Sequence, residues 1–259
     1  MEIQIKKTVK AGNSSAVILP KSWLDKEVRV ELIKKTSEEI LIDVIRITKK
    51  YIESSSIIGI YLTGSYARGE EDRDSDIDIL IITKGIDKEM VNEGIYNILI
   101  ISMELLRQKL EKDLLPVGPM IKEAKPLLNS NYLDPIKISI KKNNVEWYMN
   151  TTKDKLEIIE EVIKRAKKNN KKYLSDILAY TLILRIKTLY IIKKLTENKP
   201  YSKKELIRKI RHIYKGVAYE RYLAVKNNLK MKEGISLEET EALYDYLKKE
   251  LIKIKRSLN

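Results

Sequence analysis

The strongest constraint on the fold is a pair of apolar segments, 57–62 and 75–82, close together in the chain. The first is uninterrupted, which predicts a β-strand covered on both faces. The second opens with two aspartates, Asp76 and Asp78, separated by one isoleucine. Because side chains alternate along a strand, we expect these two carboxylates to face the same way, about 7 Å apart.

A turn and a short helix are predicted between the two strands. Gly64 and Ser65 follow the first strand, and Gly69 comes where the helix would end. A glycine lets a phosphate approach the backbone closely, while Ser65 adds a hydroxyl and an N–H at the helix start. Two neighbouring carboxylates can bind divalent cations that align the oxygens of a phosphoryl transfer. The segment therefore predicts a phosphate site beside a metal site.

This segment resembles the nucleotidyltransferase superfamily related to DNA polymerase β, and most closely its minimal nucleotidyltransferases. The resemblance is carried by Gly64-Ser65, Tyr66-Ala67-Arg68-Gly69 and Ser75-Asp76-Ile77-Asp78. It implies that Gly64 and Ser65 hold the phosphates of a nucleoside triphosphate, and that Asp76 and Asp78 bind two Mg²⁺ ions. AMP from ATP would then pass to a hydroxyl acceptor, with Asp76, Asp78 and Ser65 as catalytic residues. Arg68 either steadies the triphosphate or pairs with the acids of the next loop.

Active members of that superfamily usually have a third carboxylate on a later strand. The matching strand here is 95–101, and Asn97 occupies the matching position. An amide oxygen can ligate a metal weakly, but it brings no charge and cannot act as a base. An active transferase is our first expectation, and a weakly active or inactive nucleotide-binding domain is the alternative.

Short β-strands are predicted in the N-terminal module, residues 1–48. Period-two alternation marks 2–10, 28–33 and 39–44, and a further strand over 16–19 ends at a proline. The module resembles the AbrB/SpoVT swapped-hairpin family through Lys7, Val9, Gly12-Asn13-Ser14, Val17-Ile18-Leu19-Pro20-Lys21 and Val28-Arg29-Val30. The resemblance implies a homodimer that contacts DNA phosphates through Lys6, Lys7, Lys10 and Lys21. A dimerisation or packing module without DNA remains the alternative.

Helices are predicted throughout the C-terminal part of the chain. Apolar residues at helical spacing mark 153–168 and 173–195, and a further helix is predicted over 219–229. Capping-box patterns at Ser202 and Ser236 mark two more helix starts. We expect these helices to form an up-and-down bundle.

This bundle loosely resembles the helical domains that accompany such transferases, including HEPN-type bundles. The spacing of Arg208 and His212 departs from the HEPN ribonuclease pattern, so we do not expect a nuclease. Residues 143–152 are expected to form a linker.

The expected fold class is therefore α+β, with three domains. A small β swapped-hairpin-like module spans 1–48, a mixed-sheet nucleotidyltransferase domain spans 49–145, and an α-helical bundle spans 146–259.

Composition narrows the possible classes of function. The chain has no cysteine and one histidine, which excludes a disulfide scaffold or zinc finger and disfavours a Ser-His-Asp triad. No apolar run approaches the length that crosses a bilayer, and the N-terminus lacks a signal-peptide pattern, so we expect a soluble cytoplasmic protein. The Lys-rich, Cys-free composition is common in thermophile proteins, and we expect such a source.

Charge is distributed unevenly along the chain. Residues 51–150 carry a net charge of −4, whereas 1–50 and 151–259 carry +4 and +14. The basic ends are suited to an anionic partner, and the acceptor can be a protein, a small molecule or an RNA 3′-end.

Two hypotheses about function follow. One is a Mg²⁺-dependent nucleotidyltransferase, and the other is a dimeric, antitoxin-like DNA-binding regulator.

Overall fold

The computed structural model describes residues 6, 8–28, 30, 35–72, 75–88 and 90–258. The chain divides into two compact units, Met1–Lys35 and Thr36–Asn259. The first unit is shorter than the 1–48 module expected from the sequence, because the residues that follow Lys35 belong to the larger unit. The three-domain division itself stays a prediction.

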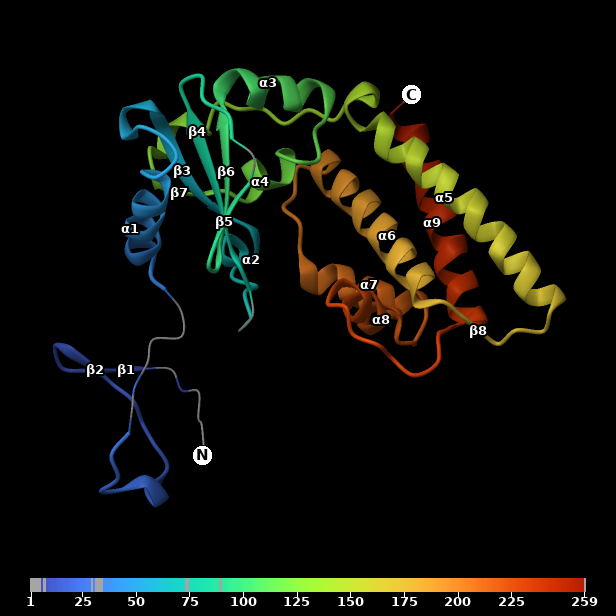
Figure 1. The fold of residues 1–259 in the computed structure, drawn as a ribbon, viewed down its shortest axis with the longest axis horizontal. Helices are drawn as coiled ribbons and strands as arrows, with labels where there is room; N and C mark the ends of the chain where they lie inside the picture. The colour runs from blue at the N-terminus through green and yellow to red at the C-terminus, as the bar shows by residue number, and fades with distance from the viewer. Residues whose placement is uncertain are drawn as a thin grey trace. The chain divides into compact units, whose positions relative to one another are not determined.

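The small unit contains a two-stranded hairpin of β1 (Val9–Ala11) and β2 (Ser14–Ala16) (Figure 1). Gly12 lies in its turn with φ +60°, a conformation that favours glycine. Ile18 and Leu24 are 68% and 70% exposed, so these two apolar side chains of the described part of the unit are not buried within it. The swapped-hairpin architecture and the dimer stay predictions.

Part of the predicted N-terminal β-structure lies outside the described residues. Of the strand predicted over 28–33, residues 28 and 30 are described, and neither belongs to a strand. Single turns of 3-10 helix lie at Lys21–Trp23, Ser54–Ser56 and Ser130–Tyr132.

The larger unit is built around a five-stranded mixed sheet, as the sequence predicts. The strand order is β5 (Val91–Glu93), β6 (Tyr96–Ser102), β4 (Ile77–Thr83), β3 (Ile57–Thr63) and β7 (Lys125–Leu128). Strands β4 and β6 run parallel, and every other neighbouring pair in this sheet is antiparallel. The two apolar segments of the sequence are thus adjacent strands, β3 and β4.

Helices cover both faces of the sheet (Figure 1). Ile77, Ile79 and Ile81 of β4 pack with α1 (Ser37–Thr48) on one face. Leu80 and Ile82 pack on the other face with residues of α3 (Met103–Lys112) and α4 (Gly118–Glu123). Because side chains alternate, Asp78 shares the face of Leu80 and Ile82. The carboxylate is therefore on the side of α3 and α4.

The strand predicted over 39–44 is wrong, because these residues belong to helix α1. Thr36 and Glu39 form a capping box at its start. Ile40, Val44 and Ile47 are buried, and this spacing is that of one helix face. The short apolar pattern over 39–44 is compatible with the repeat of a strand and with that of a helix. The capping box and the continuation of the helical pattern beyond this segment favour the helix.

Five helices form the C-terminal region: α5 (Lys142–Lys168), α6 (Asp176–Thr196), α7 (Lys203–Ile213), α8 (Ala218–Lys226) and α9 (Leu237–Ser257). The long helices α5, α6 and α9 pack against one another (Figure 1). Ser202 and Ser236 cap α7 and α9 as predicted. A short pair of strands, β8 (Tyr173–Leu174) and β9 (Ile235–Ser236), links the helices at one end.

The predicted linker over 143–152 is wrong, because these residues are the first turns of α5. Val145 and Met149 are buried, and Asn144 donates hydrogen bonds to the carbonyls of Leu110 and Ser139. The helical region therefore continues directly from the sheet region, and α4 packs against both β3 and α6.

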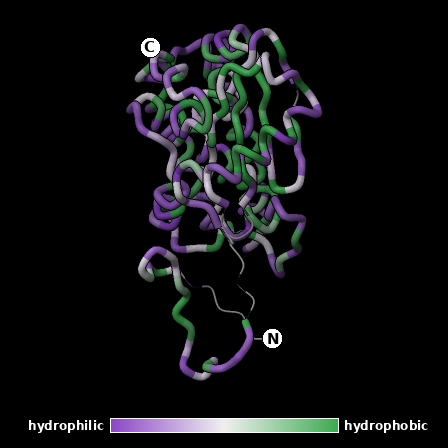
Figure 2. The backbone as a smooth tube through the Cα atoms, turned by 90° about the vertical axis from the view of Figure 1, so that its left-hand side faces the viewer, coloured by the Kyte–Doolittle hydropathy of each residue, from purple (hydrophilic) through white to green (hydrophobic). Residues whose placement is uncertain are grey.

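Apolar residues gather inside the larger unit, and polar residues follow its outer loops (Figure 2). No helix in the described part of the chain is long and apolar enough to cross a membrane.

Candidate active site

The junction of β3 and α2 (Gly64–Arg68) brings the backbone close to Asp78. Gly64 has φ +67°, and a Cβ built on it would lie 2.0 Å from Oδ2 of Asp78. Only glycine fits both the backbone conformation and this approach. Gly69 ends α2 in the left-handed conformation, as the sequence predicts. The turn and the aspartate therefore form one site.

Asp78 lies beside the residue expected at the third carboxylate position. In the parallel ladder, Asp78 of β4 is the register partner of Asn97 of β6. The Asn97 amide Nδ2 donates to Asp78 Oδ1 over 3.3 Å. Asp76 precedes β4 by one residue. The predicted positions of Asp76, Asp78 and Asn97 thus meet at one end of the two strands.

Burial raises the pKa of Asp78, and the negative charge of Asp76 adds to this rise. The hydrogen bond from Asn97 and the positive charges of Arg68 and Lys187 oppose it. Asp76 itself is exposed. A cation near these two carboxylates offsets the repulsion between them.

A carboxylate that the sequence did not single out, Glu123, completes the site. The Gly64 N–H donates to Glu123 Oε1 over 2.7 Å, and Arg68 Nη1 donates to Glu123 Oε2. Only 6% of the Glu123 side chain is exposed. The pKa of Glu123 is raised on balance, because the effect of burial exceeds the lowering effect of the Arg68 charge. No local pattern marks this residue, because it reaches the site as the last residue of α4.

Arg68 joins the sheet region to the C-terminal helices. Its Nε donates to Glu70 Oε2 over 3.0 Å, and Glu70 in turn accepts hydrogen bonds from the Ser202 hydroxyl and the Lys203 N–H at the start of α7. Burial opposes ionisation of Glu70, but these donors lower its pKa on balance. Of the two roles expected for Arg68, pairing with the loop acid is therefore present. Its contact with Glu123 adds a second partner.

Lys187 of α6 also belongs to this site. The Tyr201 ring is near two cations, with its centroid 4.9 Å from Arg68 Cζ and 5.6 Å from Lys187 Nζ. Burial lowers the pKa of Lys187, and the charges of Lys226 and Arg68 add to this effect. Within the described residues, Lys187 forms no hydrogen bond or ion pair. A lysine inside the apolar stretch of α6 is the signal that could have identified it.

Ser65 lies in the turn next to Gly64, as expected. Its carbonyl accepts a hydrogen bond from the Glu70 N–H over 2.9 Å. Its hydroxyl forms no hydrogen bond with a described residue. The hydroxyl is thus available to a ligand.

The acidic residues do not form a closed metal cage. In the described part of the chain, no group of three Asp, Glu or His side chains could hold a metal ion. Asp76 and Asp78 supply the carboxylates that lie on or next to β4. This donor set fits Mg²⁺, which is commonly bound by one or two carboxylates together with substrate phosphates.

The lysines expected to contact DNA lie in the small unit. Lys6, Lys10 and Lys21 are exposed, whereas Lys7 lies outside the described residues. Arg208 and His212 are also exposed, on α7.

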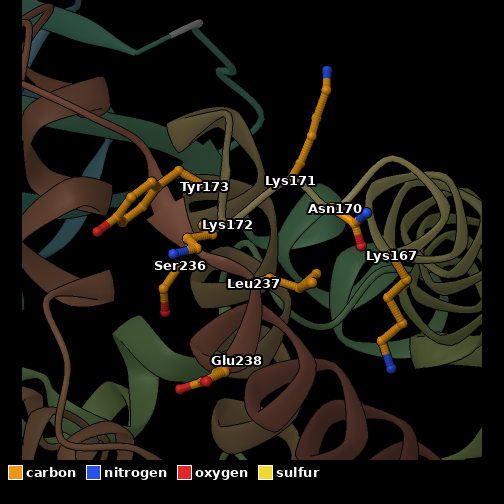
Figure 3. Close-up of a pocket in the computed structure, with 8 residues that line it drawn as sticks. All are labelled: Lys167, Asn170, Lys171, Lys172, Tyr173, Ser236, Leu237 and Glu238. Atoms are coloured by element: carbon orange, nitrogen blue, oxygen red, sulfur yellow. The ribbon is translucent and has the colours of Figure 1, made fainter.

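A cavity of about 630 Å³ lies elsewhere, between the end of α5 and the start of α9. Its lining includes Lys167, Lys171, Tyr173 and Glu238, and none of the residues around Gly64. Figure 3 shows Lys167 and Lys171 extending in different directions rather than toward a common point. The cavity therefore lacks the convergent polar groups of a catalytic site.

Comparison with known proteins identifies a family for most of the chain. Residues 44–213 match the family described as nucleotidyltransferase domain. No curated protein matches the sequence significantly.

Two solved structures resemble the chain at low sequence identity. One is a nucleotidyltransferase-like protein from Exiguobacterium sibiricum, with 10% identity and a TM-score of 0.37, covering 83% of this chain and 75% of that one. The other is a spectinomycin adenyltransferase from Enterococcus faecialis, solved with ATP and spectinomycin. It has 15% identity and a TM-score of 0.45, covering 83% of this chain and 99% of that one. Neither likeness is close enough to bear on the substrate.

Proposed function

Because this chain belongs to the nucleotidyltransferase domain family, we propose that it transfers AMP from ATP to a hydroxyl acceptor in a Mg²⁺-dependent reaction. The observation that carries the proposal is the close packing of Asp78 against Gly64. It puts a carboxylate next to a backbone turn that carries the Ser65 hydroxyl and the Arg68 guanidinium. This combination is suited to a metal-bound triphosphate.

The phosphate chain has several ligands in this proposal. The Gly64 N–H, the Ser65 hydroxyl and the Arg68 guanidinium bind its oxygens from the sheet side. Lys187 binds from the helical side, where its ammonium group has no ion-pair partner among the described residues. Hydrogen bonds between charged groups and phosphate oxygens are among the stronger polar interactions in proteins.

Asp76 and Asp78 would hold Mg²⁺ jointly with the phosphates. When bound, the ion would neutralise the charge that develops around the α-phosphorus. The acceptor hydroxyl gives up its proton to solvent and its oxygen bonds to the α-phosphorus, as the bond from the α-phosphorus to the bridging oxygen of the β-phosphate breaks and pyrophosphate leaves. The second Mg²⁺ ion stays a prediction, because Asn97 brings no charge to the third position.

The acceptor is a hydroxyl of a protein, a small molecule or an RNA. The net charge of +14 on residues 151–259 favours an anionic acceptor.

The proposal is tested with α-labelled ATP, Mg²⁺ and cell extract as the acceptor source. We expect the wild type to label an acceptor and the double variant Asp76→Asn/Asp78→Asn to label none. Asp154→Asn, an exposed carboxylate on α5, is the matched control and should behave as wild type. Circular dichroism verifies that all three proteins are folded. Equal labelling by the double variant would refute the assignment.

A second candidate function is a dimeric DNA-binding regulator with a weakly active transferase domain. Exposed Ile18 and Leu24 favour it, because apolar side chains in so small a unit are usually covered by a second copy. Exposed Lys10 and Lys21 provide cations for phosphate contacts. A gel shift of the full chain tests this candidate. DNA binding that weakens with salt and with Lys10→Ala/Lys21→Ala, without acceptor labelling, would favour the regulator.

A further inference from the structure

The two oxygens of Glu123 are bound to donors that the proposed function assigns to the nucleotide. Oε1 accepts from the Gly64 N–H over 2.7 Å, and Oε2 accepts from the Arg68 guanidinium. A backbone N–H is a single donor, so it cannot serve Glu123 and a phosphate oxygen fully at the same time. The carboxylate therefore lies where a phosphate oxygen would bind.

The neighbouring charges favour an anion at this position. Besides Arg68, Lys187 interacts electrostatically with Glu123. The negative charge of Asp78 repels Glu123. Glu123 thus balances the positive charges of the site, although at the cost of repulsion from a second carboxylate.

Helix α4 offers a route for Glu123 to leave. Glu123 is the last residue of α4, and the next residue, Ala124, already has a non-helical conformation. Its neighbour Lys122 donates from Nζ to Asn198 at the end of α6, over 2.7 Å. A rotation of one terminal side chain, or loosening of the last helical turn, would free the two donors.

We infer that Glu123 is an internal competitor of the nucleotide, which binds only when its phosphates replace the Glu123 carboxylate at Gly64 and Arg68. This inference rests on the proposed function. The resting enzyme is then held in a low-affinity state by its own carboxylate. Removing an acidic residue from the centre of the site should strengthen nucleotide binding.

The test is calorimetric titration of the full chain with ATP and Mg²⁺. Glu123→Gln keeps the size of the side chain and removes its charge. We expect ATP to bind at least about tenfold tighter to Glu123→Gln than to wild type, the lower end of what a hydrogen bond to a charged group contributes. Unchanged or weaker binding would overturn the inference.

Glu70→Gln is the matched control for charge alone. Glu70 also pairs with Arg68, but it accepts from the start of α7 rather than from Gly64. We expect its ATP affinity to change by at most about threefold, since the Gly64 N–H stays occupied. Equal tightening in both variants would show a general charge effect and refute direct competition.

Hydrogen–deuterium exchange on the wild-type protein supplies a readout that needs no variant. Saturating ATP should slow exchange over residues 64–68 and speed it over 118–124, because α4 loses the contacts of Glu123. Protection of 64–68 with no change over 118–124 would also refute the competition. Asp78→Asn distinguishes a failure of the proposed nucleotide site from a failure of the competition by Glu123. If it abolishes ATP binding while Glu123→Gln binds as wild type, the nucleotide site stands and the competition is wrong.

Discussion

Replacing Lys187 with methionine should stabilise the fold and weaken nucleotide binding. The substitution keeps an unbranched side chain and removes the ammonium group. In the native state that group is partly buried and lies near Arg68 and Lys226, which lowers its pKa. The folded protein therefore disfavours the charge that the unfolded chain carries without penalty.

The expected gain in the free energy of unfolding is about 1 kcal/mol, because the side chain is partly solvated and only part of the cost of a fully buried charge applies. For a unit of this size, that corresponds to a rise in Tm of about 2–4 °C. The pH dependence of the free energy of unfolding tests whether the Lys187 charge destabilises the fold. A depressed lysine pKa means that the native state loses this proton before the unfolded state does, so wild-type stability rises with pH through that interval. The advantage of Lys187→Met should therefore shrink as the pH is raised.

The ATP affinity of Lys187→Met should fall, although its stability rises. A hydrogen bond to a charged group contributes about 1.5–3 kcal/mol. The loss of one such contact to phosphate should therefore weaken ATP affinity by about ten- to hundredfold. Calorimetric titration measures the affinity, and thermal unfolding between pH 6 and pH 10 measures the stability. Lys193→Met, an exposed lysine on the same helix, is the control and should change neither. Lower stability together with unchanged ATP affinity in Lys187→Met would refute the reasoning.

Two further variants test other parts of the site. Asn97→Asp restores a carboxylate beside Asp78 and should increase Mg²⁺-dependent transfer by about tenfold or more, since it adds a charged metal ligand; a labelling assay with no gain would contradict this. Gly64→Ala should abolish ATP binding and lower the free energy of unfolding by about 1–3 kcal/mol, because the residue has a positive φ and its Cβ would collide with Asp78. Calorimetry and thermal unfolding measure both effects, and wild-type behaviour would mean that the turn is less constrained than its geometry implies.

The sequence predicted the parts of the site that lie close together in the chain. Gly64, Ser65, Asp76 and Asp78 lie within fifteen residues, and their strand–turn–strand order is set by local apolar patterning. Asn97 could be placed because it lies on a predicted strand. The strand at 39–44 and the linker at 143–152 were wrong because each segment is short, and its local pattern fits more than one structure. Capping at Thr36 and burial of Val145 and Met149 decided for helices.

What the sequence determined by itself is the local chemistry: a glycine turn and a hydroxyl between two successive strands, and two carboxylates at the start of the second strand. Only the tertiary structure decided which charges surround them. Glu123 and Lys187 come from α4 and α6, and neither is marked by a motif. The difference is physical, because periodicity and turn preferences act between near neighbours in the chain. Electrostatic balance in a partly buried site depends on charges brought together from distant segments.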